Sequence, residues 1–312
     1  MTGIVINLPY ASAAVPPPVA RRLALSQAEW QLEHWRLIDP HLAELARAAS
    51  VHERRGLKVE RPVVAYPLSP LVADPWGLWA GELDGRPPEA APPEAPEDSR
   101  PRPAALPRTT AGRSLAWTDQ ERDLIFSRSV VPYYRELTEA ARGLLADSPL
   151  VLVVTLRSYG TQPLPFEKNR RYPRPQAAVA ANPRLTPAGL AELAGGILKA
   201  CRWWPELNWP QAGGACLPPE LEASPRVRAL GLSLCRGLYL DERSGKRKSA
   251  APGVVRILRT FFHLLDQELA RVARLRLARA APPAKPAPKI PSPVIKADRL
   301  NDMTALPEPE AD

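Results

Sequence analysis

The chain has 312 residues, of which 45% are hydrophobic and 24% charged, with a formal net charge of +9 and three cysteines. This composition argues against a disulfide framework and favours acidic partners such as nucleic acid, anionic lipid or a carboxylate, without choosing among them. No apolar run approaches the roughly 18 residues of a membrane-spanning helix and no signal peptide is evident, so we expect a cytoplasmic protein.

The first part of the chain predicts two strands separated by a long helix. The β-branched residues of segment 3–8 predict a short buried strand that Pro9 ends. Ser26 begins a capping-box pattern, and the residues that follow predict one helix over 26–49. Residues 61–68 predict a second strand.

Two segments are rich in proline, of which the chain has 39 in all. Segment 81–113 contains few large apolar residues, so it cannot bury enough surface to offset the entropy lost on ordering. We therefore expect a flexible insertion there. Segment 281–312 is rich in Pro, Ala and Lys and then acidic, and it predicts a disordered tail for the same reason.

Helices and strands alternate between these two segments. Thr118 begins a second capping-box pattern, which predicts a helix over 118–146, and the apolar run 151–155 predicts a central strand covered on both faces. Thr186, followed by a proline, predicts the N-cap of a helix that ends near residue 203. A strand over 228–236 and a basic amphipathic helix over 254–278 complete the pattern.

This alternation predicts an α/β fold: a single domain over residues 1–280 with a mixed, mostly parallel sheet flanked by helices. The aromatic run 201–209 is a candidate stacking surface for a ligand, although we expect it to pack as the C-terminal end of a helix.

Polar and proline-containing motifs follow several of these elements in a characteristic order. The segments are VINLPYAS (5–12), PLSPLVADP (67–75), PYY (132–134), LVVTLRSY (152–159), NWPQAGG (208–214) and LSLCRGLYLDE (232–242). Together they resemble the N-formylglutamate amidohydrolase family over about residues 4–245. The resemblance implies a fold similar to the zinc carboxypeptidases (phosphorylase/hydrolase-like) and zinc-dependent hydrolysis that releases formate and glutamate.

The same resemblance implies that the metal-binding positions are changed in this chain. Tyr10 and Arg157 stand where the family places zinc-binding histidines, and Tyr134 replaces another histidine. Thr155 and Ser233 stand where the family has an aspartate and a glutamate. These positions therefore form a degenerate version of the family's site.

Other parts of the family pattern are retained. Ser69 and Asp74 match it, but Pro70 and Gly77 replace the arginines that would receive an acidic substrate. Asn208 retains the asparagine of the Asn-x-Pro-x-x-Gly loop. Ser158 matches the serine that follows the second metal-binding histidine.

The substituted residues are unsuited to zinc. A phenol stays protonated near neutral pH, and a guanidinium is permanently charged and has no lone pair to donate. At about 4 Å from a unit positive charge, an arginine would cost on the order of 4 kcal/mol at an effective dielectric of about 20. We therefore expect no zinc cofactor.

Arg157 is instead a candidate for binding a ligand's carboxylate, in a pocket completed by Asn208, Gly213 and Gly214. The alternative is that Arg157 pairs within the chain with an acid such as Asp74.

A rebuilt hydrolase would need a new base and a new nucleophile. The candidate bases are Asp39, Asp74, Glu167 and Asp241, and the candidate nucleophiles are Ser158 and Ser233. The four histidines, His34, His41, His52 and His263, lie outside the motifs, and we expect surface or packing roles for them.

Three functions therefore remain open. The first is a non-catalytic family member that binds a small acid or a protein partner, and the second is an active amidohydrolase with a rebuilt site. The third is a nucleic-acid or membrane-surface binder that uses the basic residues of 243–248 and of the last helix. We expect those basic residues to be a solvated helix face rather than a nucleic-acid site.

Overall fold

The structure is a computed structural model that describes residues 2–23, 25–54, 57–77, 109–110, 117–164, 167, 170–211 and 214–280. Most of the predicted insertion 81–113, the predicted tail 281–312 and the site candidate Gly213 lie outside these residues. The compact unit Met1–Arg274 contains all the strands of the main sheet. The second unit, Leu275–Asp312, is described only up to Ala280, as the end of a helix.

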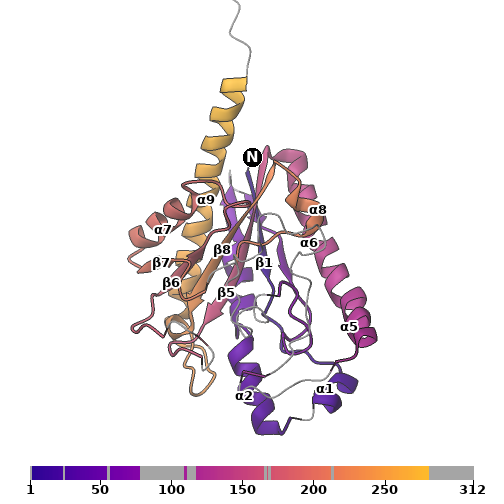
Figure 1. Cartoon of the computed structure of the whole chain (residues 1–312). Coiled ribbons are helices and arrows are strands. Elements are labelled where there is room, and N and C mark those ends of the chain that lie inside the picture. Colours follow the sequence, from indigo (N-terminus) through magenta and orange to yellow (C-terminus); the bar gives the residue numbers. More distant parts are fainter. Residues whose placement is uncertain are drawn as a thin grey trace, which may run out of the picture. The chain divides into compact units, whose positions relative to one another are not determined.

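The main sheet has six strands in the order β4-β1-β5-β8-β6-β7 (Figure 1). The pairs β4–β1, β1–β5, β5–β8 and β6–β7 are parallel, and β6–β8 is antiparallel, so the sheet is mixed and mostly parallel as predicted. The strands, in sheet order, are Val63–Ala65, Thr2–Leu8, Leu150–Tyr159, Val227–Cys235, Ala177–Ala180 and Pro205–Leu207.

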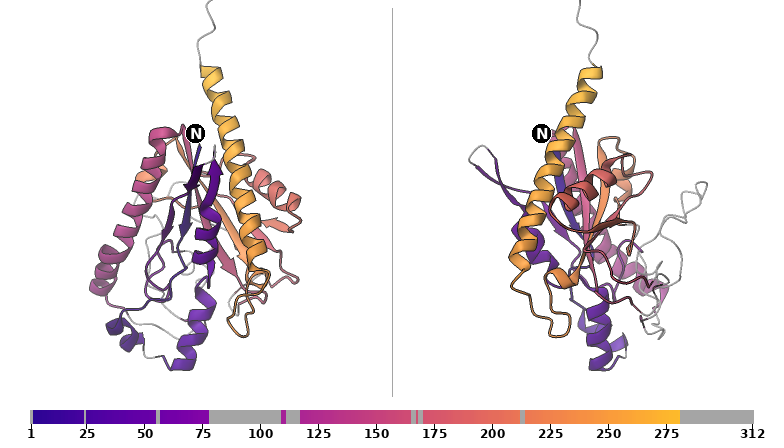
Figure 2. Two further views of the ribbon diagram at one scale, coloured as in Figure 1. Left: turned by 180° about the vertical axis from the view of Figure 1, so that it is seen from behind. Right: turned by 90° about the vertical axis from the view of Figure 1, so that its left-hand side faces the viewer.

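The central strand β5 confirms the prediction of a strand buried on both faces. Alternate residues of β5, such as Leu152 and Val154, pack against α3 (Leu42–Ser50), α7 (Leu190–Ala200) and α9 (Ala251–Ala280). The intervening residues, such as Val151 and Val153, face the opposite layer, which includes α6 (Val131–Asp147). Figure 2 shows α9 in yellow and α6 in magenta on opposite sides of the sheet.

The prediction of one helix over 26–49 is wrong in one respect, because the structure has two helices in this region. The capping box of Ser26 and Glu29 begins α2 (Gln27–Leu37), but α3 starts only at Leu42. Pro40 has no N–H to donate and disfavours a helical conformation at the residue before it. The break turns Asp39 inward, where it is fully buried.

The predicted helix over 118–146 is confirmed, with an irregularity. Thr118 and Glu121 form the expected capping box, and α5 (Asp119–Ile125) continues through a π-helical segment, Phe126–Val130, into α6. The π segment carries the buried Ser129, whose hydroxyl lies 2.9 Å from that of Tyr66. An extra residue in a helical turn thus aims a polar side chain into the core.

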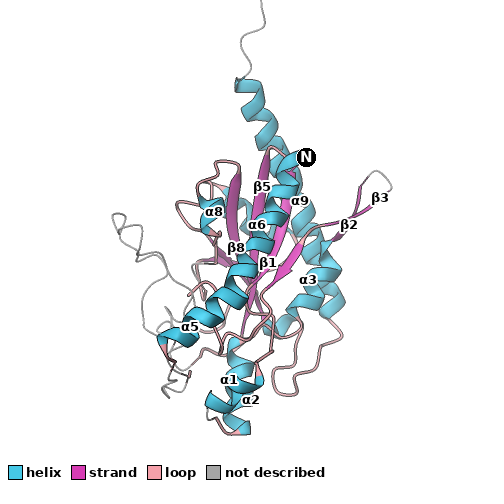
Figure 3. Ribbon diagram, turned by 90° about the vertical axis from the view of Figure 1, so that its right-hand side faces the viewer, coloured by secondary structure: helices cyan, strands magenta, loops and turns pink. Residues whose placement is uncertain are grey.

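Other boundaries differ from the predictions. Thr186 is not an N-cap, because its hydroxyl donates to the carbonyl oxygen of Ala229 and α7 begins after Gly189, which has a φ of 80°. The predicted strand 61–68 is only the short edge strand β4. The strands β6 and β7 were not predicted. Nor was the hairpin of β2 (Val51–Arg54) with β3 (Leu57–Glu60), which is visible in Figure 3. The remaining short helical segments are α1 (Pro17–Leu23), α8 (Pro219–Glu222) and the 3-10 turn Arg236–Leu238.

Thr109 and Thr110, which fall near the end of the predicted insertion, are buried against α2. The backbone N–H and the hydroxyl of Thr110 each donate to Glu33, both at 2.6 Å, and Arg36 donates to the same hydroxyl at 2.7 Å. This part of the insertion is therefore fixed to the domain. Among the described helices, none is both long and apolar enough to cross a membrane.

Candidate functional site

The site candidates gather where one face of the sheet changes from apolar to polar. Val5 and Val153 are core residues on this face, and Asn7, Thr155 and Arg157 follow them on the same sides of β1 and β5. Ser233 of β8 is the register partner of Arg157. Because β1, β5 and β8 are parallel, their carboxyl ends meet at one edge, where α/β folds usually bind ligands.

Tyr10, Asp74 and Arg157 form the centre of this edge. The Tyr10 hydroxyl donates to Oδ1 of Asp74 at 2.6 Å, and the Arg157 guanidinium carbon lies 4.8 Å from the centroid of the Tyr10 ring. Arg157 is only 1% exposed, and Tyr10 and Asp74 are fully buried. Tyr10 and Arg157, for which the resemblance of the sequence implied two histidine positions, are therefore in contact, and the phenol of Tyr10 connects Arg157 to Asp74.

The chemistry of Tyr10 follows from this burial. Removal from water, reinforced by the negative charge of Asp74, raises the pKa of Tyr10 well above its ordinary value, although Arg157 opposes the shift. The phenol therefore stays protonated and acts as a hydrogen-bond donor. A protonated phenol is not a zinc ligand.

Further aromatic residues fill the space beside this cluster. The amide of Asn7 donates to Thr155 at 3.1 Å and accepts a hydrogen bond from the Tyr133 hydroxyl. Trp76 donates to the same Tyr133 hydroxyl at 3.2 Å. Tyr134 stacks on Trp76 at 4.8 Å between centroids and donates to the carbonyl oxygen of Pro75. Each of these polar side chains thus has a partner inside the protein.

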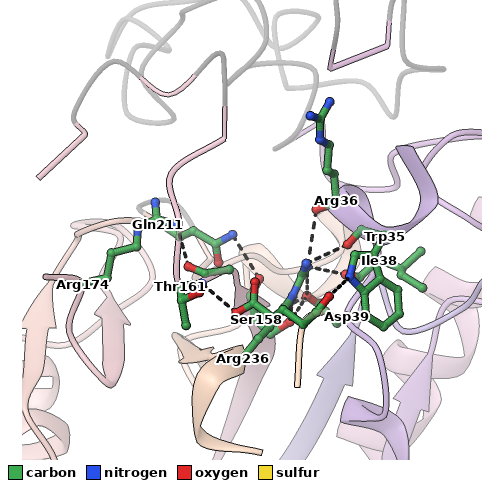
Figure 4. A network of polar contacts seen from close by, with 11 residues as sticks. Trp35, Arg36, Ile38, Asp39, Ser158, Thr161, Arg174, Gln211 and Arg236 are labelled. Atoms are coloured by element: carbon green, nitrogen blue, oxygen red, sulfur yellow. Dashed lines mark hydrogen bonds and ion pairs between the residues drawn. The ribbon is translucent and has the colours of Figure 1, made fainter. Parts of the chain in front are cut away.

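A second polar network adjoins the first at the end of β5 (Figure 4). Oδ1 of Asp39 accepts hydrogen bonds from the backbone N–H and the hydroxyl of Ser158, both at 2.8 Å. Arg236 donates through Nε to the Ser158 hydroxyl at 3.0 Å. The network thus connects three segments of the chain: the break between α2 and α3 with Asp39, the end of β5 with Ser158, and the turn after β8 with Arg236.

Arg236 also caps the C-terminal end of α2. Its guanidinium donates to the carbonyl oxygen of Trp35 at 2.7 Å and to that of Ile38, which are among the carbonyls without an intrahelical partner (Figure 4). A cation at this position also suits the negative end of the helix dipole. The network therefore holds α2 against the carboxyl end of the sheet.

Asp39 is the titratable centre of this network. Removal from water raises the pKa of Asp39 from 3.8 to about 6, although the charges of Arg236 and Arg157 and the hydrogen bonds from Ser158 oppose the shift. Its Oδ2 atom accepts no hydrogen bond from the described residues. The backbone N–H of Asp39 donates to the carbonyl oxygen of Tyr10 at 2.7 Å, which connects the two clusters.

The structure assigns local contacts to several other candidates. The Ser69 hydroxyl accepts from the N–H of Leu71 at 3.3 Å within a turn. Asn208 accepts at 3.0 Å from the N–H of Ala181, and so joins the residues that follow β6 and β7. Gly214 lies against Gly231 of β8, where a Cβ on Gly231 would come within 2.9 Å of the Gly214 backbone.

The remaining acidic candidates lie in separate contacts. Glu167 pairs with Arg174, and Asp241 is in an exposed turn in which it accepts from the Ser244 hydroxyl at 2.5 Å. Residues 201–209 follow the end of α7 and form a turn and the strand β7, so the expected C-terminal end of a helix is wrong for this segment. Trp203 and Trp209 are buried, whereas Trp204 is 43% exposed.

Zinc does not fit the residues at this edge. The side chains at the site positions that the resemblance implied supply two phenols, two hydroxyls and a guanidinium, and the guanidinium lies against the Tyr10 phenol. Within the described residues, no three His, Cys, Asp or Glu side chains gather closely enough to hold a metal ion. His41 contacts the carbonyl oxygen of Gly245, and His263 contacts Gln267 on α9.

The sequence interpretation missed the roles of Arg236, Asn7 and Tyr133. It named Asp39 only as one candidate base, because the helical pattern was extended across it. The Asp-Pro pair at positions 39 and 40 was the available signal, since a residue before proline rarely continues a helix. No local signal identified Arg236, whose partners lie between 78 and 201 residues away in the sequence.

Comparisons with known proteins show the family through one family model and the fold through two solved structures. A search of curated proteins found no match. The N-formylglutamate amidohydrolase of Ralstonia eutropha JMP134 shares 20% identity over 88% of this chain and 94% of its own, with a TM-score of 0.58. A gene product of Agrobacterium tumefaciens shares 18% identity over 88% of this chain and 91% of its own, with a TM-score of 0.57. The family model for N-formylglutamate amidohydrolase matches residues 2–240, and this chain therefore belongs to the N-formylglutamate amidohydrolase family.

Proposed function

We propose that this chain is a family member without zinc-dependent amide hydrolysis, and that it acts by binding a small carboxylic acid or a protein partner. The observation that carries the proposal is the contact of Arg157 with Tyr10, whose hydroxyl is bonded to Asp74. A guanidinium and a protonated phenol occupy the positions at which the family places metal-binding histidines. Neither group can coordinate zinc or activate a zinc-bound water.

The position of Arg157 supports a carboxylate as the ligand. Arg157 lies at the carboxyl end of the central parallel strands, which is the usual place for a ligand in this class of fold. A guanidinium binds a carboxylate through two parallel hydrogen bonds. Because Arg157 is only 1% exposed, binding requires the residues over it to move aside.

The proposal is tested by metal analysis and a hydrolysis assay on the same preparation. After equilibration with zinc and removal of the excess, we expect far less than one zinc per chain and no formate release from N-formylglutamate above the blank. Stoichiometric zinc together with hydrolysis would show the proposal to be wrong.

Calorimetry with glutamate and related dicarboxylic acids tests the small-acid ligand. We expect heat of binding for the wild type, weaker binding for Arg157→Lys and none for Arg157→Ala. The lysine variant is the matched control, since it keeps the charge and loses the bidentate geometry. The same heat for wild type and Arg157→Ala would exclude this site, and no heat for the wild type would leave only the protein partner.

One observation favours a second candidate, an amidohydrolase with a rebuilt site. The Ser158 hydroxyl lies 2.8 Å from Oδ1 of Asp39, which is the spacing of a nucleophile and its base. Arg236 donates to the same hydroxyl, however, and Ser158 is fully buried. If this candidate is correct, the protein hydrolyses its amide substrate in the presence of a metal chelator, and Ser158→Ala abolishes that hydrolysis. Hydrolysis that the chelator stops and that Ser158→Ala retains would exclude the candidate.

A binder of nucleic acid or of membrane surfaces is the weakest candidate. Two residues of the basic turn already have partners, because Arg247 pairs with Glu44 at 3.0 Å and Lys248 donates to the carbonyl oxygen of Gly237 at 2.7 Å. Salt-dependent retention on heparin, lost on neutralising Arg243 and Lys246, would bring this candidate forward.

A further inference from the structure

An open groove lies at the β7 end of the sheet, opposite the edge strand β4. It has a volume of about 260 Å³ and is lined by residues of α7 and of the edge strand β7. These two elements lie side by side in Figure 1. Its apolar lining consists of Val179, Ala191, Gly195, Gly196, Pro205 and Leu207. Leu207 is 50% exposed, so the groove carries apolar surface that is in contact with water.

Two adjacent glycines in the middle of α7 shape this groove. Glycine disfavours a helix interior, so Gly195 and Gly196 weaken the helix that they belong to. Packing within the domain does not require them, because a Cβ atom on either would have no other part of the described chain within 4 Å. The missing side chains therefore leave space on the surface rather than in the core.

Three charged residues line the groove: Glu206, which pairs with Arg171 at 3.0 Å, and two opposite charges on α7 at equal distances from the glycine pair. Glu192 and Lys199 line it on the exposed side of α7, and within the described chain neither of them makes an ion pair. The midpoint of Gly195 and Gly196 lies 3.5 residues from each, which corresponds to about 5 Å along the helix axis. The two charges are therefore placed symmetrically about the glycine pair, which is the point where another helix can approach α7 most closely.

We infer that the groove is a self-association surface for a second copy of this chain. The two α7 helices cross antiparallel at Gly195 and Gly196, and a two-fold axis passes through the crossing. Each Glu192 then lies opposite Lys199 of the second copy, and the dimer covers both copies of Leu207.

The charge pattern selects the second copy and its direction. A parallel arrangement would place each Glu192 against its own equivalent, and like charges in contact are unfavourable. The antiparallel arrangement satisfies both charges of both copies through one surface, as a closed two-fold dimer requires. Because one 11-residue helix and a short strand make a small contact, we expect weak association that depends on protein concentration and on salt.

Sedimentation velocity of the full chain over a range of concentrations tests the charge pairing. We expect a monomer–dimer equilibrium at low salt, with a dissociation constant raised at least about tenfold by Glu192→Lys or by Lys199→Glu. The double variant Glu192→Lys/Lys199→Glu restores the pairing with reversed sign, so its dissociation constant should return close to that of the wild type. Glu139→Lys, at an exposed position on α6, is the control for net charge.

Gly196→Trp tests the close approach of the two helices independently of charge. The variant should fold, because a side chain at this position has open space in the monomer, but it should remain monomeric. Gly143→Trp is the matched control, since Gly143 is an exposed α6 glycine with equally open surroundings. The inference is overturned if the wild type is monomeric at all concentrations, if Gly196→Trp still dimerises, or if the double charge reversal fails to restore association.

Discussion

Replacement of Asp39 by asparagine tests the physical account of the polar network. Asparagine keeps a carbonyl oxygen that can accept both hydrogen bonds from Ser158, but it cannot ionise. Burial raises the pKa of Asp39 from 3.8 to about 6, so folding opposes its ionisation. The folded state is therefore more stable with Asp39 protonated than with Asp39 ionised.

The sign of the pH dependence follows from this shift. An acid whose pKa is higher in the folded state contributes its full stability below about pH 4 and loses it as the pH rises through about 6. The difference between 3.8 and about 6 corresponds to about 3 kcal/mol, because one pKa unit is worth about 1.4 kcal/mol. The wild type therefore loses about this much, relative to Asp39→Asn, between pH 4 and pH 8.

Urea unfolding of both proteins at pH 4, 6 and 8 measures this difference directly. The free energy of unfolding of Asp39→Asn minus that of the wild type should rise by about 3 kcal/mol from pH 4 to pH 8. Asp147→Asn, at an exposed position at the end of α6, corrects for the loss of one negative charge. A difference that stays constant with pH, or falls, would refute the reasoning. It would mean that Arg236 and Arg157 stabilise the ionised carboxylate at least as much as burial destabilises it.

Three further substitutions have expected effects on stability, each measured by urea unfolding. Gly231→Ala should destabilise the fold by about 1–3 kcal/mol, because the new Cβ would lie 2.7 Å from that of Ala180. Gly143→Ala should instead stabilise the fold by about 0.5–1 kcal/mol, since that α6 position has open space and alanine favours a helix. Equal effects of Gly231→Ala and Gly143→Ala on stability would contradict the packing argument. Tyr10→Phe should cost about 1–3 kcal/mol, because it removes the 2.6 Å hydrogen bond to the buried Asp74 and leaves the longer one, at 3.3 Å, from the N–H of Trp76. An unchanged stability would contradict the importance of the Tyr10 hydrogen bond.

The order of the motifs along the chain was enough to identify the family and the class of fold. The strand ends that carry Tyr10 and Arg157 were recognised from the surrounding residues, and the structure brings the two side chains into contact. A strand shows its burial through its own residues, so the continuous apolar run of β5 predicted a central position correctly. Capping boxes at Ser26 and Thr118 were equally reliable, because both partners lie within four residues.

The edges of the sheet were harder to predict. The strands β6 and β7 have only four and three residues, which is too short for a periodic pattern to be distinguished from a loop. The antiparallel pairing of β6 with β8 depends on contacts between residues more than 50 positions apart. Local propensity contains no information about such a pairing.

Local patterns, in which each residue acts on neighbours within one or two turns, therefore decided the helix starts at Ser26 and Thr118 and the central strand. The tertiary structure alone decided that Tyr10 bonds to Asp74, that Asp39 and Arg236 meet at Ser158, and that α7 presents an open groove. The physical reason is that burial and partnership of a polar group depend on which distant segments surround it. A sequence states which groups are present, but only the fold determines how far each is from water and from the others.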